Sequence, residues 1–367
     1  MQLDNIEAAV AAIAAGEPVV VVDDADRENE GDLIMAASAA TAETMGFIVR
    51  HTSGIVCVPM TAERARRLNL PPMVATNLDP MRTAFTISVD YKIGMTTGIA
   101  ADERANTARA LASGKAQASD FLRPGHVFPL IARVGGVLAR SGHTEAATDL
   151  AHLAGLPSVG ILAEIVHDDG SLQRLPDLAV FTNRHGLKII SIEDLIAYRL
   201  RRESLLRCVK EETVAISDLT GRARIYQTPF DPLQHLAFTF GDISSGRDIP
   251  THIHRERPIA ELVGQMTAAR SWLDAASAHI RTAGKGILVF LRTARLDERP
   301  YQESVQTGSY DVEQHGRARA RMQRWRETGL GAQILRDLGV RSIEALGAPG
   351  PYTELSGYGI EVTGVAA

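Results

Sequence analysis

The sequence predicts an α/β protein with two domains. Its 367 residues exceed what one domain usually holds. Helix-like and strand-like segments alternate over about the first two hundred residues, which is the pattern of an α/β domain. Short strand-like pieces, a long helical pattern and another strand follow residue 205. We therefore expect a first domain over residues 1–204 and a second α/β domain over residues 205–367.

Local patterns predict the elements of the first domain. Residues 6–14 have helical spacing, and residues 18–22 contain four consecutive valines, typical of a buried strand. Ser191 begins a segment that resembles a capping box and opens a helix at residues 195–203, whose last turn carries arginines. Further helices are expected at residues 41–50, 105–112 and 146–154, and further strands at residues 54–58, 136–139 and 159–166.

The second domain has weaker patterns. Short strands are expected at residues 214–216, 223–226 and 236–240. A helical pattern follows at residues 260–280, then a strand at residues 286–291 and a basic helical stretch that ends at Trp325. No stretch rich in proline, glycine or serine separates the two domains, so we expect them to be joined tightly.

Composition limits the class of protein. A hydrophobic fraction of 45% and a charged fraction of 23% are typical of a soluble globular chain. The net charge of −5 argues against a nucleic-acid partner. The first residues lack a signal-peptide pattern and no apolar window would span a membrane, so a cytoplasmic protein is expected. Cys57 and Cys208 are isolated, which excludes a disulfide framework and a Cys-x-x-Cys zinc site.

An acidic loop, residues 23–32, comes directly after the valine strand. It contains Arg27, Glu28, Glu30 and Asp32, and a strand terminus is where open α/β sheets usually bind ligands. Several carboxylates repel one another unless a cation or an arginine neutralises them. The loop therefore indicates a metal and sugar-phosphate site. The alternative is a solvated turn, because Asp, Asn and Gly are common turn residues.

A second polar segment runs from Arg140 through Ser141, Gly142, His143 and Thr144 to a glutamate, just before a predicted helix. Free backbone N–H groups, the helix dipole, an arginine and a hydroxyl together suit a phosphate group. The histidine could ligate a divalent ion if the acidic loop lies opposite it. The alternative is a simple helix cap by the threonine with an exposed histidine.

Two further residues are candidates for proton transfer. Glu164 lies in an apolar strand, where desolvation raises a carboxyl pKa unless a partner compensates. The alternative places it at the strand end, in contact with solvent or an arginine. His126 lies in what reads as a rigid turn between two prolines, and it is either a general acid and base or a structural histidine. Residues 96–99 offer hydroxyls and a tight turn, which a simple helix cap explains equally well. Cys57 is expected to be a small core residue, and the alternative is a thiol that lines the site.

The first two hundred or so residues resemble 3,4-dihydroxy-2-butanone 4-phosphate synthases of riboflavin biosynthesis. Five motifs in order carry the resemblance, at residues 26–32, 53–57, 96–99, 123–129 and 140–146. The resemblance implies conversion of D-ribulose 5-phosphate to L-3,4-dihydroxy-2-butanone 4-phosphate and formate. It also implies a requirement for Mg²⁺ or Mn²⁺, no organic cofactor, and a homodimer with sites at the subunit interface.

The resemblance also implies a role for each matched residue. Glu28 and His143 would ligate metal. His126 and Glu164 would move protons during enediol formation, skeletal rearrangement and loss of formate. The sugar phosphate would be held by Arg27, Glu28, Asp32, Arg140, Ser141, Gly142, His143, Thr144 and Glu164.

From about residue 205 the chain resembles GTP cyclohydrolase II, most clearly at residues 284–292, 329–340 and 357–362. The family's zinc-binding cysteines are missing, because residues 253–257 replace a His-Ser-Glu-Cys segment and no cysteine follows Cys208. Arg324 and Arg326 stand where the family has an aspartate and an arginine, and residues 347–351 replace a guanine-site motif.

We therefore expect a degenerate, non-catalytic second domain without zinc. His252, His254 and His279 are weak evidence for a substitute metal site, because their spacing shows no recognisable ligand set. The alternative is a bifunctional enzyme that retains GTP cyclohydrolase II activity through unrecognised ligands. A binding protein whose first domain has lost catalysis is a third reading, which the complete motif set opposes.

Overall fold

A computed structural model describes residues 3–24, 27–216, 218–229, 231–256, 266–292, 327–347, 352 and 355–366. The chain divides into two compact units, residues 1–198 and 199–367. The division falls inside helix α7 (Ile192–Arg202), and the boundary expected at residue 204 stays a prediction. Both units combine helices with a mixed sheet, so the expectation of two α/β domains is confirmed.

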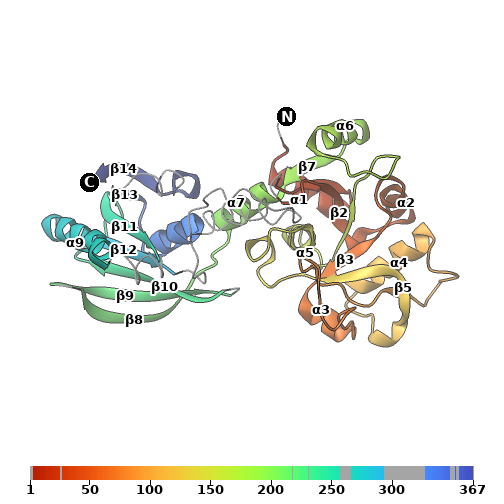
Figure 1. The fold of residues 1–367 in the computed structure, drawn as a ribbon, viewed down its shortest axis with the longest axis horizontal. Helices are drawn as coiled ribbons and strands as arrows, with labels where there is room; N and C mark the ends of the chain where they lie inside the picture. The colour runs from red at the N-terminus through yellow and green to blue at the C-terminus, as the bar shows by residue number, and fades with distance from the viewer. Residues whose placement is uncertain are drawn as a thin grey trace, which may run out of the picture. The chain divides into compact units, whose positions relative to one another are not determined.

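The described residues of the first unit form a seven-stranded sheet in the order β4-β5-β3-β6-β2-β1-β7 (Figure 1). Strand β1 is parallel to β7, and β3 is parallel to β5, whereas the other neighbours are antiparallel. The strands are β1 (Val19–Val22), β2 (Gly31–Ala36), β3 (Cys57–Met60), β4 (Val89–Tyr91), β5 (Phe121–Ile131), β6 (Gly160–Glu164) and β7 (Lys188–Ser191). All residues of β1 and β2 are buried, as expected for central strands covered on both faces.

Helix α5 packs along β2, β3 and β6, with α1 beside it, whereas α6 packs on β1 and β7 and α2 packs on α4 (Figure 1). The helices are α1 (Ile6–Ala14), α2 (Ala42–His51), α3 (Ala62–Arg67), α4 (Ala101–Ala112), α5 (His143–Leu153) and α6 (Leu175–His185). Short 3-10 turns lie at η1 (Ala37–Ala39), η2 (Ala118–Asp120) and η3 (Gly136–Leu138). Side-chain caps begin several helices: Asn5 accepts from Ala8 N at 2.7 Å, and Thr41 forms a capping box with Thr44.

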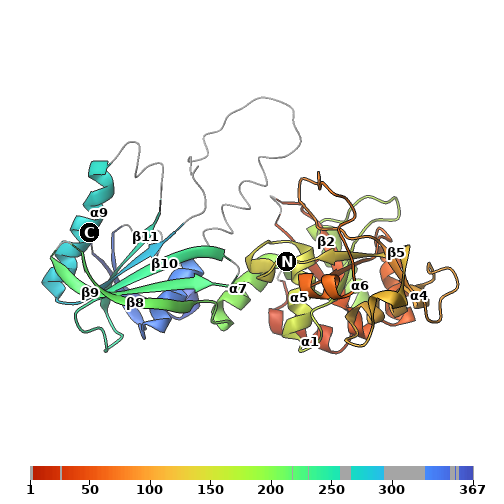
Figure 2. The same ribbon diagram turned by 90° about the horizontal axis from the view of Figure 1, so that it is seen from below.

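The described part of the second unit contains another seven-stranded sheet, in the order β14-β13-β11-β12-β10-β9-β8. Its strands are β8 (Arg207–Ile216), β9 (Leu219–Thr228), β10 (Asp231–Phe240), β11 (Ile249–Arg255), β12 (Gly286–Leu291), β13 (Ser342–Leu346) and β14 (Glu361–Ala366). Helix α9 (Met266–Ala283), drawn at the left of Figure 2, packs on β11 and β12. A 3-10 turn, η4 (Leu355–Tyr358), precedes the last strand.

Several elements differ from expectation. The strand expected at residues 54–58 begins only at Cys57, because Gly54 has a φ of +78° that an extended strand does not allow. Residues 136–138 form a 3-10 turn instead of a strand, since Gly136 also has a positive φ of +61°. His126 lies within the long strand β5 and not in a turn. Pro129 fits this strand because its carbonyl still accepts from Thr86 N at 3.0 Å.

The second-unit strands are longer than expected, because β8 pairs with β9 along its whole length although nearly all of its residues are exposed. The start of the helix expected from residue 260 and the basic stretch up to Trp325, with Arg324, lie outside the described residues. Within the described ranges, no helix has the length and apolar character to cross a membrane.

Candidate functional site

Strand register brings the acidic residues of the first unit to one end of its sheet. Val21 of β1 pairs with Asp32 of β2, and Asp32 pairs with Glu164 of β6. The loop between β1 and β2 contains the remaining acids and lies at the same end. The carboxylates that are far apart in the sequence are therefore neighbours because of the sheet.

Asp23 organises the backbone of the acidic loop. Its Oδ1 accepts from Glu30 N at 3.0 Å, and its Oδ2 accepts from Glu28 N at 3.0 Å and from Arg27 Nη1 at 2.9 Å. Arg27 also contacts the Glu28 carboxylate. Burial opposes the charge of the Arg27 guanidinium, but Glu28 and Asp23 outweigh this effect and raise its pKa. Asn29 has a φ of +53°, a left-handed conformation that turns the chain between the two glutamates.

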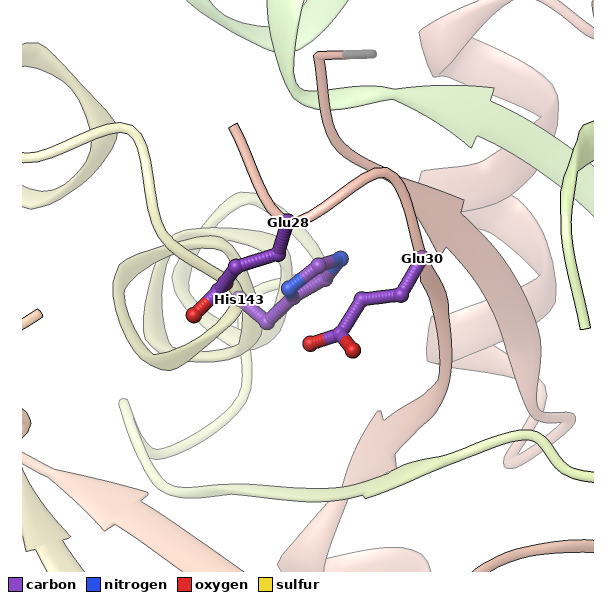
Figure 3. A group of neighbouring side chains, drawn as sticks. All are labelled: Glu28, Glu30 and His143. Carbon is purple, nitrogen blue, oxygen red and sulfur yellow. The ribbon is translucent and has the colours of Figure 1, made fainter. Parts of the chain in front are cut away.

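Glu28, Glu30 and His143 converge, with ligand atoms that all lie within 4.8 Å of one another. Figure 3 shows the His143 imidazole, from α5, between the two glutamate side chains of the loop. His143 Nε2 lies 3.1 Å from Val21 O. When Nε2–H donates to this carbonyl, Nδ1 presents its lone pair, and burial lowers the pKa of the ring so that it stays neutral. Two carboxylates and a neutral imidazole form a ligand set for a divalent cation.

The carboxylates around this group repel one another. Burial, followed by the charges of Glu28, Glu164 and Asp23, raises the pKa of Glu30 to about 8. Burial also raises the pKa of Asp32 well above its usual range, with Glu164 as the largest neighbouring charge. The Asp32 Oδ1 atom is buried and has no hydrogen-bond partner in the described part of the chain. A bound cation fits these residues, because it would compensate the charge that burial and repulsion oppose.

Glu164 is the last residue of β6 and is only half-buried, whereas the four residues before it are buried. Its Oε2 accepts from Ser53 Oγ at 2.7 Å. The structure therefore agrees with the alternative that Glu164 lies at the strand end. The carboxylate is held by a hydroxyl at the edge of the site, which leaves it access to a ligand.

His126 lies at the same end of the sheet as Glu164. Cys57 pairs with Phe128 of the parallel strand β5 and with Leu162 of the antiparallel strand β6. His126 comes two positions before Phe128 and Glu164 two positions after Leu162, so both lie toward the same end of the strands. Cys57 itself is buried in the core, as expected, and burial raises its pKa.

An aspartate fixes the orientation of His126. His126 Nδ1 lies 2.7 Å from Asp90 Oδ2, and His126 N donates to Asp90 Oδ1 at 2.9 Å. The side chain remains 42% exposed, so Nε2 is available for proton transfer. A Cβ atom at Gly98 would lie 2.2 Å from Asp90 Oδ2, so the close approach of this loop requires glycine.

The polar segment before α5 lies beside the acidic loop, because His143 is the first residue of the helix. Gly142 is the N-cap and provides no side-chain acceptor, so the helix start can present backbone N–H groups to an anion. Thr144 is buried inside the first turn, so a cap by this threonine and an exposed histidine are both wrong. Arg140 Nη1 pairs with Glu145 Oε2 at 2.7 Å, and Ser141 is half-buried.

The sequence alone did not assign Glu30, Asp23 or Asp90. Glu30 shares an acidic loop with several other carboxylates, and only the folded loop directs it toward His143. Asp90 lies 36 positions before its histidine partner, a separation that gives no local pattern. For Asp23 and Glu30, the sequence signal was their place in the acidic loop, which indicated a site but not the role of each residue.

In the second unit, His252 and His254 lie on β11, as alternate residues of one strand. His252 Nδ1 lies 2.8 Å from Leu346 O, and the His254 ring stacks on Trp272 with centroids 4.0 Å apart. His279 pairs with Glu344 at 3.5 Å. Among the described residues, Glu28, Glu30 and His143 form a group of three potential metal ligands. The described histidines of the second unit belong to no such group.

Comparison with known proteins identifies both units. A model of the 3,4-dihydroxy-2-butanone 4-phosphate synthase family matches residues 7–198. The chain belongs to this family. A model of GTP cyclohydrolase II matches residues 207–367, so the second unit of this synthase belongs to that second family. The synthase is an enzyme with 3,4-dihydroxy-2-butanone 4-phosphate synthase activity in riboflavin biosynthesis.

A curated relative from Oryza sativa subsp. japonica is 45% identical over 98% of this synthase and 69% of its own length. It is named "Probable bifunctional riboflavin biosynthesis protein RIBA 1, chloroplastic". A crystal structure of RibBX, described as a two-domain 3,4-dihydroxy-2-butanone 4-phosphate synthase from A. baumannii, is 35% identical with a TM-score of 0.78. It covers 99% of this chain and 100% of its own. A crystal structure of a synthase with two magnesium ions is 47% identical with a TM-score of 0.53, over 55% of this chain and 98% of its own.

These findings change one expectation. The second unit was expected to be degenerate and non-catalytic, yet its family model matches residues 207–367, and three curated relatives carry the word bifunctional in their names, although one is named monofunctional. The comparisons thus favour the alternative of a bifunctional enzyme over that expectation.

Proposed function

We propose that the first unit converts D-ribulose 5-phosphate to L-3,4-dihydroxy-2-butanone 4-phosphate and formate, at the end of the sheet where Glu28, Glu30 and His143 converge. The convergence of these three ligands beside Asp32 and Glu164 is the observation that carries the proposal. A cation site therefore lies beside acids whose pKa values are raised by burial. Enediol chemistry on a sugar phosphate needs both a cation to stabilise negative charge and acids to transfer protons.

Mg²⁺ or Mn²⁺ would be held by Glu28, His143 and Glu30, the last an addition to the ligands implied by the sequence. When bound, the cation polarises the ketone and hydroxyl oxygens of the substrate and stabilises the negative charge of an enediolate. Asp32 contributes a buried carboxylate to the same wall of the site.

The sugar phosphate would bind at the start of α5. The Gly142 N–H donates to Arg140 O at 2.8 Å, so the backbone N–H groups offered to the phosphate are those of His143 and Thr144, and Ser141 offers a hydroxyl. Arg140 brings a positive charge that Glu145 holds in place, since the two side chains pair at 2.7 Å. Arg27, anchored on Asp23, would contribute its charge from the acidic loop. Binding energy from this phosphate orients the reacting carbons.

Proton transfer is assigned to His126 and Glu164. Asp90 holds His126 through Nδ1, which directs Nε2 to the substrate, and stabilises the imidazolium that forms when the ring accepts a proton. Ser53 holds one oxygen of the Glu164 carboxylate and leaves the other for a substrate hydroxyl. The protein is further predicted to be a homodimer and to be located in the cytoplasm.

The test measures formate released from D-ribulose 5-phosphate by the purified full-length chain. We expect release that EDTA abolishes and Mg²⁺ or Mn²⁺ restores, and no release by Glu164→Ala. Glu43→Ala, an exposed change in the first turn of α2, is the matched control and should keep full activity. An inert wild-type protein with intact metal binding would overturn the proposal.

GTP cyclohydrolase II activity in the second unit is a second candidate function. The family match and the bifunctional relatives favour it. The chain's ligands restrict how it could work, because Cys57 belongs to the first unit and Cys208 is exposed on β8, so no pair of thiolates can hold zinc in this unit. We infer that any GTP turnover here uses no cysteine-bound zinc.

Zinc content and formate release from GTP, measured on the same preparation, decide between the two readings. Turnover by wild type that survives Cys208→Ser establishes the bifunctional enzyme and its unusual ligands. A protein without turnover at any supplied divalent metal restores the non-catalytic reading. Synthase activity in the same sample shows that the protein is folded.

A further inference from the structure

We propose that Arg174, the N-cap residue of α6, is a positioning residue for the metal ligands. This inference rests on the proposed function, because it assumes that Glu28 and Glu30 bind the cation. Arg174 Nη1 donates to Glu28 O at 2.7 Å and also contacts Asn29 O, so one nitrogen holds two successive carbonyls of the acidic loop. These atoms are 145 or more positions away in the sequence.

The Arg174 backbone is fixed by the helix that it begins. Arg174 is the N-cap of α6, and its carbonyl accepts from Asp177 N and Leu178 N, both at 2.9 Å. Pro176, in the first turn of the helix, stiffens this start because its ring fixes φ. The guanidinium therefore extends from a rigid base, so that holding the loop requires little additional ordering.

Helix α6 contacts the acidic loop at a second point, one helical turn further on. A Cβ atom at Gly31 would lie 2.5 Å from Leu178 Cδ1, so the returning loop packs directly on this leucine. Residues four apart lie on the same face of a helix, so Leu178 and Arg174 form one surface against the loop. Gly31 begins β2, and the contact fixes where the loop ends.

Arg174 and Asp23 hold different backbone groups of the acidic loop. Asp23 accepts the N–H groups of Glu28 and Glu30, and Arg174 holds the carbonyls of Glu28 and Asn29. The two glutamate side chains are then left to meet at His143. The left-handed Asn29, at a φ of +53°, is the strained residue that this support stabilises.

Loss of this support should loosen the ligand loop. The ligand atoms of Glu28, Glu30 and His143 lie within 4.8 Å of one another, and two carboxylates at this range repel before a cation arrives, so an unsupported loop would separate its two glutamates. Partners that orient metal ligands typically change metal affinity by about 10- to 100-fold when they are removed. We expect a weaker metal site with an otherwise intact fold.

The experiment measures Mn²⁺ binding without substrate, from the electron paramagnetic resonance signal of free Mn²⁺, in wild type, Arg174→Gln and Arg174→Lys. We expect Arg174→Gln to weaken binding by about 10- to 100-fold, and Arg174→Lys, which keeps a cationic donor, to lie between. Arg184→Gln, an exposed arginine in the last turn of the same helix, is the matched control and should bind as wild type does.

Activity at rising Mn²⁺ separates a positioning role from direct substrate contact. A positioning role predicts that saturating Mn²⁺ restores most of kcat in Arg174→Gln, whereas a residue that touches the substrate predicts no recovery. If Arg174→Gln binds Mn²⁺ as tightly as wild type, the inference is wrong. If the glutamine variant does not fold, the lysine variant decides, because unchanged Mn²⁺ affinity there has the same meaning. Wild type that binds no Mn²⁺ refutes the proposed metal site itself.

Discussion

Metal binding by the synthase should depend steeply on pH, because Glu30 must lose a proton before it can ligate. Its pKa in the metal-free protein is raised from 4.5 to about 8, with burial as the main cause. Below that value the cation competes with a proton, so apparent affinity rises by up to about tenfold per pH unit and then levels off. His143 adds no competing proton near neutral pH, since burial lowers its pKa and the ring is already neutral.

The magnitude follows from the ionised fraction of Glu30. With a pKa of about 8, that fraction rises from about 3% near pH 6.5 to about 76% near pH 8.5, a change of about 25-fold, or about 2 kcal/mol. Near pH 7 each cation should release about 0.9 proton, which calorimetry in two buffers of different ionisation enthalpy can count. The probe is Mn²⁺ alone.

Glu30→Gln is the matched variant, because it keeps the size of the side chain and removes the proton that titrates. We expect weaker Mn²⁺ binding in this variant at every pH and a shallower pH dependence. A folded carboxyl with a raised pKa favours the folded state at low pH and opposes it as pH rises, so the metal-free wild type should lose thermal stability toward pH 8 more than the variant does. Wild-type Mn²⁺ affinity that stays constant over this range would refute the reasoning.

Two further substitutions test the surroundings of the site. Gly98→Ala should reduce stability by about 1–3 kcal/mol and activity more severely, since the residue has a φ of +88° and the added Cβ would lie 2.2 Å from Asp90 Oδ2. Thermal unfolding and formate release measure this, with Gly114→Ala, which meets no atom within 4 Å, as the control. Asp32→Asn should raise the melting temperature of the metal-free protein, more at about pH 9 than at about pH 6, because the pKa of this buried acid is raised. The same variant should lose about 100-fold or more in kcat, and a variant with normal activity would contradict its place in the site.

The sequence predicts best those elements whose pattern is local. The helix at residues 6–14 and the strand of valines have the expected bounds to within a residue, because Asn5 caps the helix and β-branched residues suit a buried strand. Strand β8 was underestimated for the opposite reason. Nearly all of its side chains are exposed, so its extent depends on pairing with β9, which no periodicity in its own residues records.

The candidate site was predicted as a set of residues but not as a geometry. Sequence order placed an acidic loop, a histidine before a helix and a glutamate in a strand, and strand register then brought Asp32 beside Glu164. Glu30 could not be assigned because its role depends on a left-handed neighbour and on an arginine far along the chain. Such contacts depend on tertiary structure, and a single sequence does not contain them in a readable form.

The acidic loop uses its charges for two different purposes. Both carboxylate oxygens of Asp23 accept hydrogen bonds, from two backbone N–H groups and from Arg27, so Asp23 acts as part of the scaffold. Glu28 and Glu30 have their backbones held by that scaffold, and their carboxylates are directed toward His143. A loop in which every carboxylate were paired would be more stable without metal, but it would have no ligands to offer a cation. The raised pKa of Glu30 is thus the physical consequence of burying its carboxylate beside other carboxylates before a cation binds.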